Sequence, residues 1–374
     1  MSLMYGGRKL EIEKGNGAEI YDSNGKRYID FVCGHGSSLF GHNHPVLVDA
    51  LKEAAARPWS TGIGFSSSKR EEFMGKLKGI MPEGKVFLCN SGTESIEAAL
   101  KLVMVFKPKR KKIVALRRAF HGRTLGSLSL TFNPQYRKPW RSRLQEVIHV
   151  NPEDIKDVVD EETAAVFVEP VQGESGVHIM EKEHVKMINE SCQKAGAMLV
   201  CDEIQTGWGR CGSILASEVL GLEPDMVCLA KGVAGGLPVG ATLWKGEYGD
   251  FPVKGHGTTY GGNPLVSAVG LAAMNLLSSE KYPEQAMDKG KYLRKKLSAI
   301  DSPLINEVRG VGLLNGIELT VKAAGVVKSL QEKGVLSLTA SPLVLRLLPP
   351  FVATKEQIDE VAAIVEKVLE DHSE

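Results

Sequence analysis

Short, unbroken apolar runs recur through the middle of this chain and alternate with stretches of helical pattern. The run Ala-Ala-Val-Phe-Val at 164–168 and the run Met-Leu-Val-Cys at 198–201 have no polar alternation, which is typical of strands covered on both faces. The pattern predicts an α/β architecture in which helices flank a sheet, and it leaves the order of the strands open. The expected strands cover residues 86–89, 113–116, 125–130, 147–150, 165–168, 198–201, 226–229 and 239–243.

The two ends of the chain have a different pattern from its middle. Residues 18–21 and 28–31 alternate polar and apolar side chains around the turn sequence Asp-Ser-Asn-Gly at 22–25, which is typical of a β-hairpin. Near the other end, Thr354 and Gln357 have capping-box spacing at the start of an amphipathic final helix. We expect both ends to build one small domain beside a central large domain. The expected boundaries are 1–45 for the N-terminal part of the small domain, 46–264 for the large domain and 265–374 for the C-terminal part.

The composition restricts the classes of function. The net charge is +1, so overall charge gives no argument for binding nucleic acid or a membrane surface. The six cysteines show no Cys-x-x-Cys spacing, which favours buried thiols over a metal site or a disulfide framework. The N-terminus has no apolar core of the signal-peptide type, and no stretch approaches ~20 apolar residues. We therefore expect a cytoplasmic protein that binds no metal, nucleic acid or membrane.

Lys231 ends one apolar run and opens the glycine-rich stretch Gly-Val-Ala-Gly-Gly at 232–236. Burial lowers the pKa of such a lysine, and a neutral amine is a nucleophile towards aldehydes. Asp202 ends another apolar run, and a carboxylate beside a lysine at neighbouring strand ends suits a pyridine cofactor with an aldehyde group. The alternative for Lys231 alone is a side chain that extends from a core strand to solvent.

Residues 90–94, Asn-Ser-Gly-Thr-Glu, follow a predicted strand and precede a helical run. Ser91 and Glu94 have capping-box spacing, which would place Gly92 and Thr93 in the first turn, where free main-chain amides bind phosphate. A plain capped helix is the alternative.

Further polar residues follow predicted strands. Phe120 offers an aromatic face to a cofactor ring, and Arg123 offers a bidentate grip on a carboxylate. Glu174 and Gln205 follow two other strands, at the edge where open α/β sheets bind ligands. The alternative is that Phe120 is an ordinary buried side chain and Arg123 an ordinary surface one.

Together and in this order, these motifs resemble those of the class III (subgroup II) pyridoxal-phosphate-dependent aminotransferases, over essentially the whole chain. The resemblance is strongest to the branch of acetylornithine aminotransferases, and within it to archaeal-type enzymes for carrier-linked aminoadipate semialdehyde. The short N-terminus and residues 65–72 and 335–338 favour the latter. The resemblance implies fold type I: a large domain with a mostly parallel seven-stranded sheet flanked by helices, and a small α+β domain.

The resemblance also implies roles for the cofactor-binding residues. Lys231 would bond covalently to pyridoxal 5'-phosphate, and Asp202 would pair with its pyridine nitrogen. Phe120 would stack on the ring. The remaining implied contacts are Gln205 to the phenolic oxygen, Gly92 and Thr93 to the phosphate, and Thr259 to the phosphate from the partner subunit of a homodimer.

The implied reaction moves an ω-amino group between an N2-blocked basic amino acid and 2-oxoglutarate, as in arginine or lysine biosynthesis. Arg123 and Thr258 would contact the blocked substrate. Arg346 would bind the α-carboxylate of glutamate, and Glu174 would pair with Arg346 while the ω-amino substrate is bound. An ornithine or other ω-amino acid aminotransferase of the same class is the alternative, followed by aminomutase or decarboxylase chemistry and by a non-catalytic scaffold.

Some features stay outside this pattern. Cys211 and residues 33–36 depart from the common family sequence, and the departure at 61–68 leaves the far end of the substrate open. Basic clusters at 107–112 and 137–143 are either solvated loops or a docking surface for an acidic amino-group carrier protein.

Overall fold

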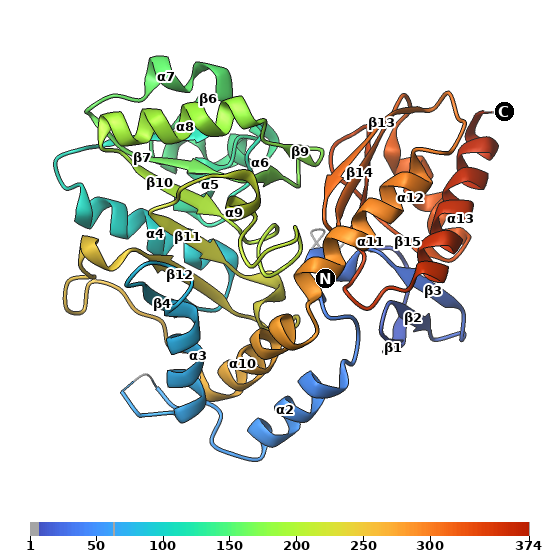
Figure 1. Ribbon diagram of the computed structural model, residues 1–374, viewed down its shortest axis with the longest axis horizontal. Coiled ribbons are helices and arrows are strands. Elements are labelled where there is room, and N and C mark those ends of the chain that lie inside the picture. Colours follow the sequence, from blue (N-terminus) through green and yellow to red (C-terminus); the bar gives the residue numbers. More distant parts are fainter. Residues whose placement is uncertain (1–6, 63, 374) are drawn as a thin grey trace.

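The computed structural model describes residues 7–62 and 64–373. Figure 1 shows two lobes, and the blue N-terminal strands lie beside the orange and red C-terminal elements. Within the described residues, every helix is too short or too polar to cross a membrane.

A twisted sheet forms the centre of the larger lobe. Its strands are β4 (Lys85–Cys89), β5 (Lys112–Leu116), β6 (Ile148–Val150), β7 (Thr163–Val168), β10 (Met198–Asp202), β11 (Met226–Leu229) and β12 (Gly240–Trp244). They form a seven-stranded sheet in the order β4-β12-β11-β10-β7-β5-β6. β12 runs antiparallel to its neighbours, and the other neighbouring strands are parallel. This is the mostly parallel sheet that the resemblance implied, and it confirms the expected strands other than 125–130.

Helices cover both faces of the sheet because successive strand residues point in opposite directions. Ala165 and Phe167 of β7 belong to the core under α4 (Gly92–Phe106). Val166 and Val168 belong to the core on the other face, under α8 (Lys182–Ala195). An unbroken apolar run is therefore what a strand between two helical layers requires.

The prediction of a strand at 125–130 is wrong, because these residues form helix α5 (Leu125–Leu130). The Glu97 carboxylate accepts hydrogen bonds from the main-chain amides of Gly126 at 2.9 Å and Ser127 at 3.1 Å. A carboxylate from a distant helix thus satisfies the free amides of the first turn and stabilises the helix. The local alternation of leucine and serine contains no sign of this contact.

The smaller lobe combines both ends of the chain. Its strands and helices are β1 (Ile12–Asn16), β2 (Glu19–Asp22), β3 (Arg27–Asp30), β13 (Ile305–Val311), β14 (Leu314–Leu319), β15 (Val335–Leu336), β16 (Leu338–Thr339), β17 (Val344–Leu347), α11 (Tyr282–Leu297), α12 (Ala323–Glu332) and α13 (Lys355–Ser373). β2 and β3 form the predicted hairpin, and β15 adds to β3 in parallel. The predicted capping box is confirmed, since Thr354 N–H donates to Gln357 Oε1 and Gln357 N–H donates to Thr354 Oγ1.

Three helices pack together at the base of the large lobe. They are α2 (Pro45–Ala55), α3 (Ser68–Lys78) and α10 (Pro264–Ser279). α10 packs against both of the others and against the 3-10 turn η4 (Lys231–Ala234). The division of the chain into domains at residues 45 and 264 remains our proposal.

The other short elements mostly connect these layers. They are α1 (Cys33–Gly36), α6 (Pro134–Arg137), η2 (Lys138–Arg143), η3 (Pro152–Asp154), α7 (Ile155–Val158), β8 (Val171–Gln172), β9 (His178–Ile179), α9 (Ala216–Leu220) and η5 (Gly246–Tyr248).

Candidate active site

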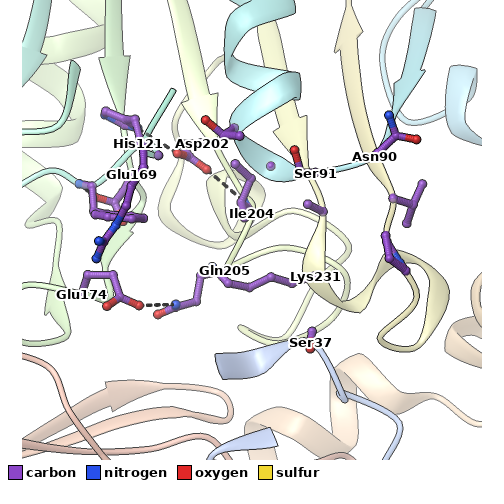
Figure 2. Close-up of a pocket in the computed structure, with 18 of the residues that line it drawn as sticks. Ser37, Asn90, Ser91, His121, Glu169, Glu174, Asp202, Ile204, Gln205 and Lys231 are labelled. Carbon is purple, nitrogen blue, oxygen red and sulfur yellow. Dashed lines mark hydrogen bonds and ion pairs between the residues drawn. The ribbon is translucent and has the colours of Figure 1, made fainter. Parts of the chain in front are cut away.

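A cavity of about 440 Å³ opens at the carboxyl edge of the central sheet. Its lining includes residues that follow four neighbouring strands, as expected for ligand sites of open α/β sheets (Figure 2). The predicted site residues that line it are Gly92, Thr93, Phe120, Arg123, Glu174, Asp202, Gln205 and Lys231. The structure thus brings together eight side chains or main-chain groups that the sequence singled out.

Lys231 lies two residues after the end of β11 and begins η4 with a φ of +47°. This left-handed conformation is unusual for a residue with a side chain, and strained positions of this kind cluster at functional sites. Burial lowers the pKa of the Lys231 ammonium, although Glu174 and Asp202 partly offset this effect. The amine is therefore easier to deprotonate than an ordinary lysine, as its predicted chemistry requires.

Asp202 is buried at the end of β10, and two donors hold its carboxylate. Oδ2 lies 2.8 Å from Nδ1 of His121, and Oδ1 accepts a hydrogen bond of 3.1 Å from the Ile204 amide (Figure 2). The sequence analysis did not select His121, although it stands next to Phe120 in the same motif. The burial of His121 and its contact with Asp202 arise only in the folded chain, so the local sequence gives no sign of them.

The N-terminus of α4 faces the cavity. Ser91 Oγ accepts a hydrogen bond from the Glu94 amide at 3.3 Å, as capping-box spacing predicts. The Glu94 carboxylate reaches back to the Asn90 amide at 2.7 Å, one residue before the one expected. Gly92 and Thr93 then occupy the first turn, where main-chain amides and the helix dipole favour a phosphate.

Arg346 is almost fully buried on β17 and forms an ion pair with Glu174. Its Nη1 lies 2.8 Å from Glu174 Oε1 and also donates to the Gly173 carbonyl at 2.8 Å and to Gln205 Oε1 at 3.1 Å. Burial opposes ionisation of Glu174, but the charges of Arg346 and Lys231 overcome it and lower the carboxyl pKa. Glu174 lines the cavity and Arg346 does not, so the ion pair places Arg346 behind Glu174.

Arg123 is exposed at the cavity mouth, with its guanidinium carbon 4.2 Å from the ring centroid of Tyr136. Behind it, the Phe120 amide donates to Glu169 Oε1 at 2.8 Å. Burial and the neighbouring Asp202 raise the pKa of Glu169 well above its usual value. Glu169 lines the cavity, and our interpretation of the sequence gave it no individual role.

The two threonines that the sequence singled out, Thr258 and Thr259, are placed differently. Thr258 Oγ1 accepts a hydrogen bond of 2.9 Å from Asn90 Nδ2, and Asn90 lines the cavity. Thr259 is exposed and is not part of the lining formed by its own chain. Its predicted contact across a dimer stays a prediction.

The donor set fits a pyridine aldehyde phosphate. A lysine with a lowered pKa, a buried carboxylate, an aromatic side chain and a helix N-terminus surround one cavity. These groups match, in turn, the aldehyde, ring nitrogen, ring face and phosphate of pyridoxal 5'-phosphate.

Fold and site together define a pyridoxal-phosphate-dependent aminotransferase of fold type I, and the comparisons agree. The family model "Aminotransferase class-III" matches residues 5–369, so the chain belongs to that family. The chain is 43% identical to the [LysW]-aminoadipate semialdehyde transaminase of Deinococcus radiodurans, over 98% of this chain and 88% of the relative. It is 39% identical to the acetylornithine aminotransferase of Methanosarcina acetivorans, over 97% of this chain and 92% of the relative. The ornithine aminotransferase structure from Toxoplasma gondii superposes with a TM-score of 0.94 at 30% identity, covering 100% of this chain and 93% of that one.

Proposed function

We propose that this chain transfers the ω-amino group of an N2-blocked basic amino acid to 2-oxoglutarate, giving glutamate and a semialdehyde. The observation that carries the proposal is the 2.8 Å ion pair of Arg346 and Glu174 beside a cavity lined by Lys231 and Asp202. A buried guanidinium without an anionic partner is costly, so an anion that pairs with Arg346 in each half-reaction is stabilising. Glutamate supplies that partner with its α-carboxylate, and Glu174 supplies it when an amine without a second carboxylate is bound.

The cofactor residues have separate roles in this proposal. The bound cofactor supplies an electron sink for the carbanion at the substrate carbon. Lys231 would hold the cofactor through its side-chain nitrogen, and its amine, when free, would move a proton to and from the substrate carbon. Asp202 would pair with the ring nitrogen and favour its protonated form. The holding contacts are Gly92 and Thr93 to the phosphate, Phe120 to the ring face and Gln205 to the phenolic oxygen.

The blocked substrate lies towards the mouth of the cavity. Arg123 is the cation that would bind its α-carboxylate, and Thr258 would contact it beside Asn90. Relatives named for acetylornithine and for LysW-linked aminoadipate semialdehyde support a basic amino acid with a blocked α-amine, in arginine or lysine biosynthesis. Ornithine or another free ω-amino acid is the alternative, which the ornithine aminotransferase structure favours.

Product analysis tests this function. The loaded protein is incubated with 2-oxoglutarate and, in turn, N2-acetylornithine, N2-acetyllysine and ornithine, and glutamate is measured by mass spectrometry. We expect one glutamate for each blocked substrate consumed, and neither visible colour nor turnover from Lys231→Ala. Preference for free ornithine would select the alternative, and full turnover by Lys231→Ala would refute the mechanism.

We propose that a carrier protein presents the substrate, and that it docks on the basic segment 137–143. Lys138, Arg141 and Arg143 are exposed there and form no ion pair among the described residues. The segment follows Tyr136, against which Arg123 lies at the cavity mouth. A basic surface at this position favours an acidic carrier.

Two residues of the other basic cluster, 107–112, have structural contacts. Arg110 donates to the main-chain carbonyls of Thr163 and Ala195, and Lys112 pairs with Asp160 at 2.7 Å. Lys112 also begins β5, so it lies at the sheet edge opposite the cavity.

Reversing the charges of Arg141 and Arg143 tests the docking surface at 137–143. It is expected to lower kcat/KM for a carrier-linked substrate at low salt and to leave kcat/KM for the free acetylated substrate unchanged. Equal effects on both substrates would contradict docking of a carrier protein on this segment.

We further propose a homodimer in which Thr259 completes the partner's cavity. The exposure of Thr259 and of the adjacent Tyr260 supports this. Mixing inactive Lys231→Ala and Thr259→Glu subunits tests it, because each mixed dimer regains one intact site. Monomers in sedimentation, or no recovery on mixing, would contradict the shared site.

A further inference from the structure

Arg210 is a fully buried cation whose contacts join the two lobes. It lies on the loop after β10, and its side chain is 1% exposed. Nη1 donates to the Leu313 carbonyl at 3.1 Å and to the Pro349 carbonyl at 2.7 Å, and Nη2 donates to the Gly36 carbonyl at 3.4 Å. These hydrogen bonds all go to main-chain oxygens, and no carboxylate pairs with Arg210 among the described residues. A buried charge without a counter-ion is costly, so the contacts it makes need an explanation.

The Gly36 carbonyl belongs to a left-handed turn. Cys33, Gly34, His35 and Gly36 have φ values of +48°, +56°, +56° and +91°. Two of the four carry side chains, for which this conformation is strained, so the surrounding structure must hold the turn in place. The Arg210 guanidinium supplies one of these external contacts.

This turn packs against the stem of Lys231. A Cβ placed on Gly36 would lie 3.8 Å from Lys231 Cδ and 3.6 Å from Leu348 Cδ1, which is ordinary van der Waals contact. Ser37, the next residue, lines the cavity and lies below Lys231 in Figure 2. The turn therefore forms one wall of the channel in which the Lys231 side chain runs.

The second contact of Arg210 reaches the segment that carries Arg346. Pro349 follows β17, three residues after Arg346, and Arg210 holds its carbonyl oxygen. The Arg210 guanidinium thus forms hydrogen bonds both to the turn beside Lys231 and to the segment that follows β17, the strand that carries Arg346.

We propose that Arg210 is a positioning residue for the reaction: it holds the left-handed turn against Lys231 and fixes the end of β17 behind Arg346. It touches neither cofactor nor substrate in this role. The inference rests on the proposed function for its effect on turnover, but the contact with the turn is independent of any cofactor.

Arg294 provides a matched control. It is a half-buried arginine that donates to the Gly312 carbonyl at 3.1 Å and to Asn315 Oδ1 at 2.7 Å, next to the loop that Arg210 also holds. It has no hydrogen bond to the turn at 33–36 among the described contacts. A general loss of stability in this lobe would affect both arginine variants, whereas the proposed role belongs to Arg210 alone.

The test compares Arg210→Lys with Arg294→Lys, using the full protein loaded with pyridoxal phosphate. A lysine keeps the charge but cannot span three carbonyls. For Arg210→Lys we expect hydrogen exchange at the amides of 33–37 to rise by about tenfold or more. We also expect the midpoint pH of the visible absorption band to shift by about half a unit or more. Arg294→Lys should leave both unchanged.

Gly36→Ala gives a second route to the same wall, since it strains the turn and keeps the Arg210 guanidinium, whose Nη2 would lie 3.9 Å from the new Cβ in ordinary contact. It should shift the absorption midpoint too. Unchanged exchange and midpoint in Arg210→Lys, or equal changes in Arg294→Lys, would overturn the proposal. If wild-type protein gave no visible band and no glutamate, the proposed function would fail, while the exchange experiment would still report whether Arg210 holds the turn.

Discussion

The imidazole Nδ1 of His121 lies 2.8 Å from Oδ2 of Asp202, and both side chains are buried. The second ring nitrogen, Nε2, is also buried and has no protein partner among the described residues. An Nδ1–H donor towards Asp202 fixes the orientation of the carboxylate that the proposal aims at the cofactor nitrogen. Asp202 otherwise receives the single amide hydrogen bond from Ile204.

Replacing His121 by phenylalanine should therefore weaken the cofactor site while it preserves most of the ring volume. Loss of a hydrogen bond to a charged group costs about 1.5–3 kcal/mol, which corresponds to roughly ten- to a hundredfold. We expect losses of this size in kcat and in pyridoxal phosphate affinity, measured by steady-state kinetics and absorption titration. Wild-type values for both would show that the contact does not support Asp202.

The ion pair of Glu174 and Arg346 leads to a prediction about substrate preference. In Glu174→Gln the guanidinium loses its anionic partner unless a dicarboxylate is bound. We expect kcat/KM for glutamate to change by less than about threefold and that for the ω-amino substrate to fall by more than about tenfold. The rate of each half-reaction, measured separately by absorbance with glutamate and with the ω-amino substrate, distinguishes the two effects.

Arg346→Met is the matched variant, and it should show the opposite pattern, with the larger loss on glutamate. Equal losses on both substrates in Glu174→Gln would contradict a switch between them.

Sequence patterns predicted those parts of this molecule that depend on local order. The apolar runs predicted seven strands of the central sheet because burial on both faces leaves no polar alternation. The residues Asp202 and Lys231 were found because strand ends in such a sheet meet at one edge, and β10 and β11 are indeed neighbours.

What the sequence could not supply depends on contacts between distant segments. Helix α5 is stabilised by Glu97, and its own residues look like a strand. Glu169 contacts the Phe120 amide and His121 contacts Asp202, and folding alone brings these partners together. The resemblance named the candidate site residues and the pair of Glu174 and Arg346, but it did not identify His121 or Glu169.

Arg123 has no acidic partner in the described structure and lies over Tyr136 at the cavity mouth. Arg123→Ala should raise KM for the blocked amino acid by about tenfold or more, because a charged hydrogen bond to its carboxylate is lost. Glutamate should be affected less, since Arg346 binds its α-carboxylate in the proposal. Arg123→Lys should restore only part of the loss, because a lysine cannot bind a carboxylate through two parallel hydrogen bonds. A uniform effect on both substrates would show that the α-carboxylate of the blocked amino acid binds elsewhere.

His149 makes the folded protein sensitive to acid. Burial lowers its pKa to about 4, the Leu130 carbonyl partly opposes this, and Arg137 and His121 add to the lowering. Nε2 lies 3.0 Å from the Leu130 carbonyl oxygen, so the neutral ring donates there. The unfolded chain has the ordinary histidine pKa near ~6.5 and binds the proton first. Stability is therefore fully present above about pH 6.5 and is lost as the pH falls towards about 4, by about 2 kcal/mol once solvent screening of this partly exposed ring is included.

His149→Gln keeps a donor for the Leu130 carbonyl and removes the titrating group. The free energy of unfolding, measured with urea at pH 7.5 and at pH 4, should fall less on acidification in this variant than in wild type. His372→Gln, on the exposed end of α13, controls for the loss of a histidine elsewhere in the chain. Should wild type, His149→Gln and His372→Gln all lose the same free energy between the two pH values, the acid sensitivity arises from other groups.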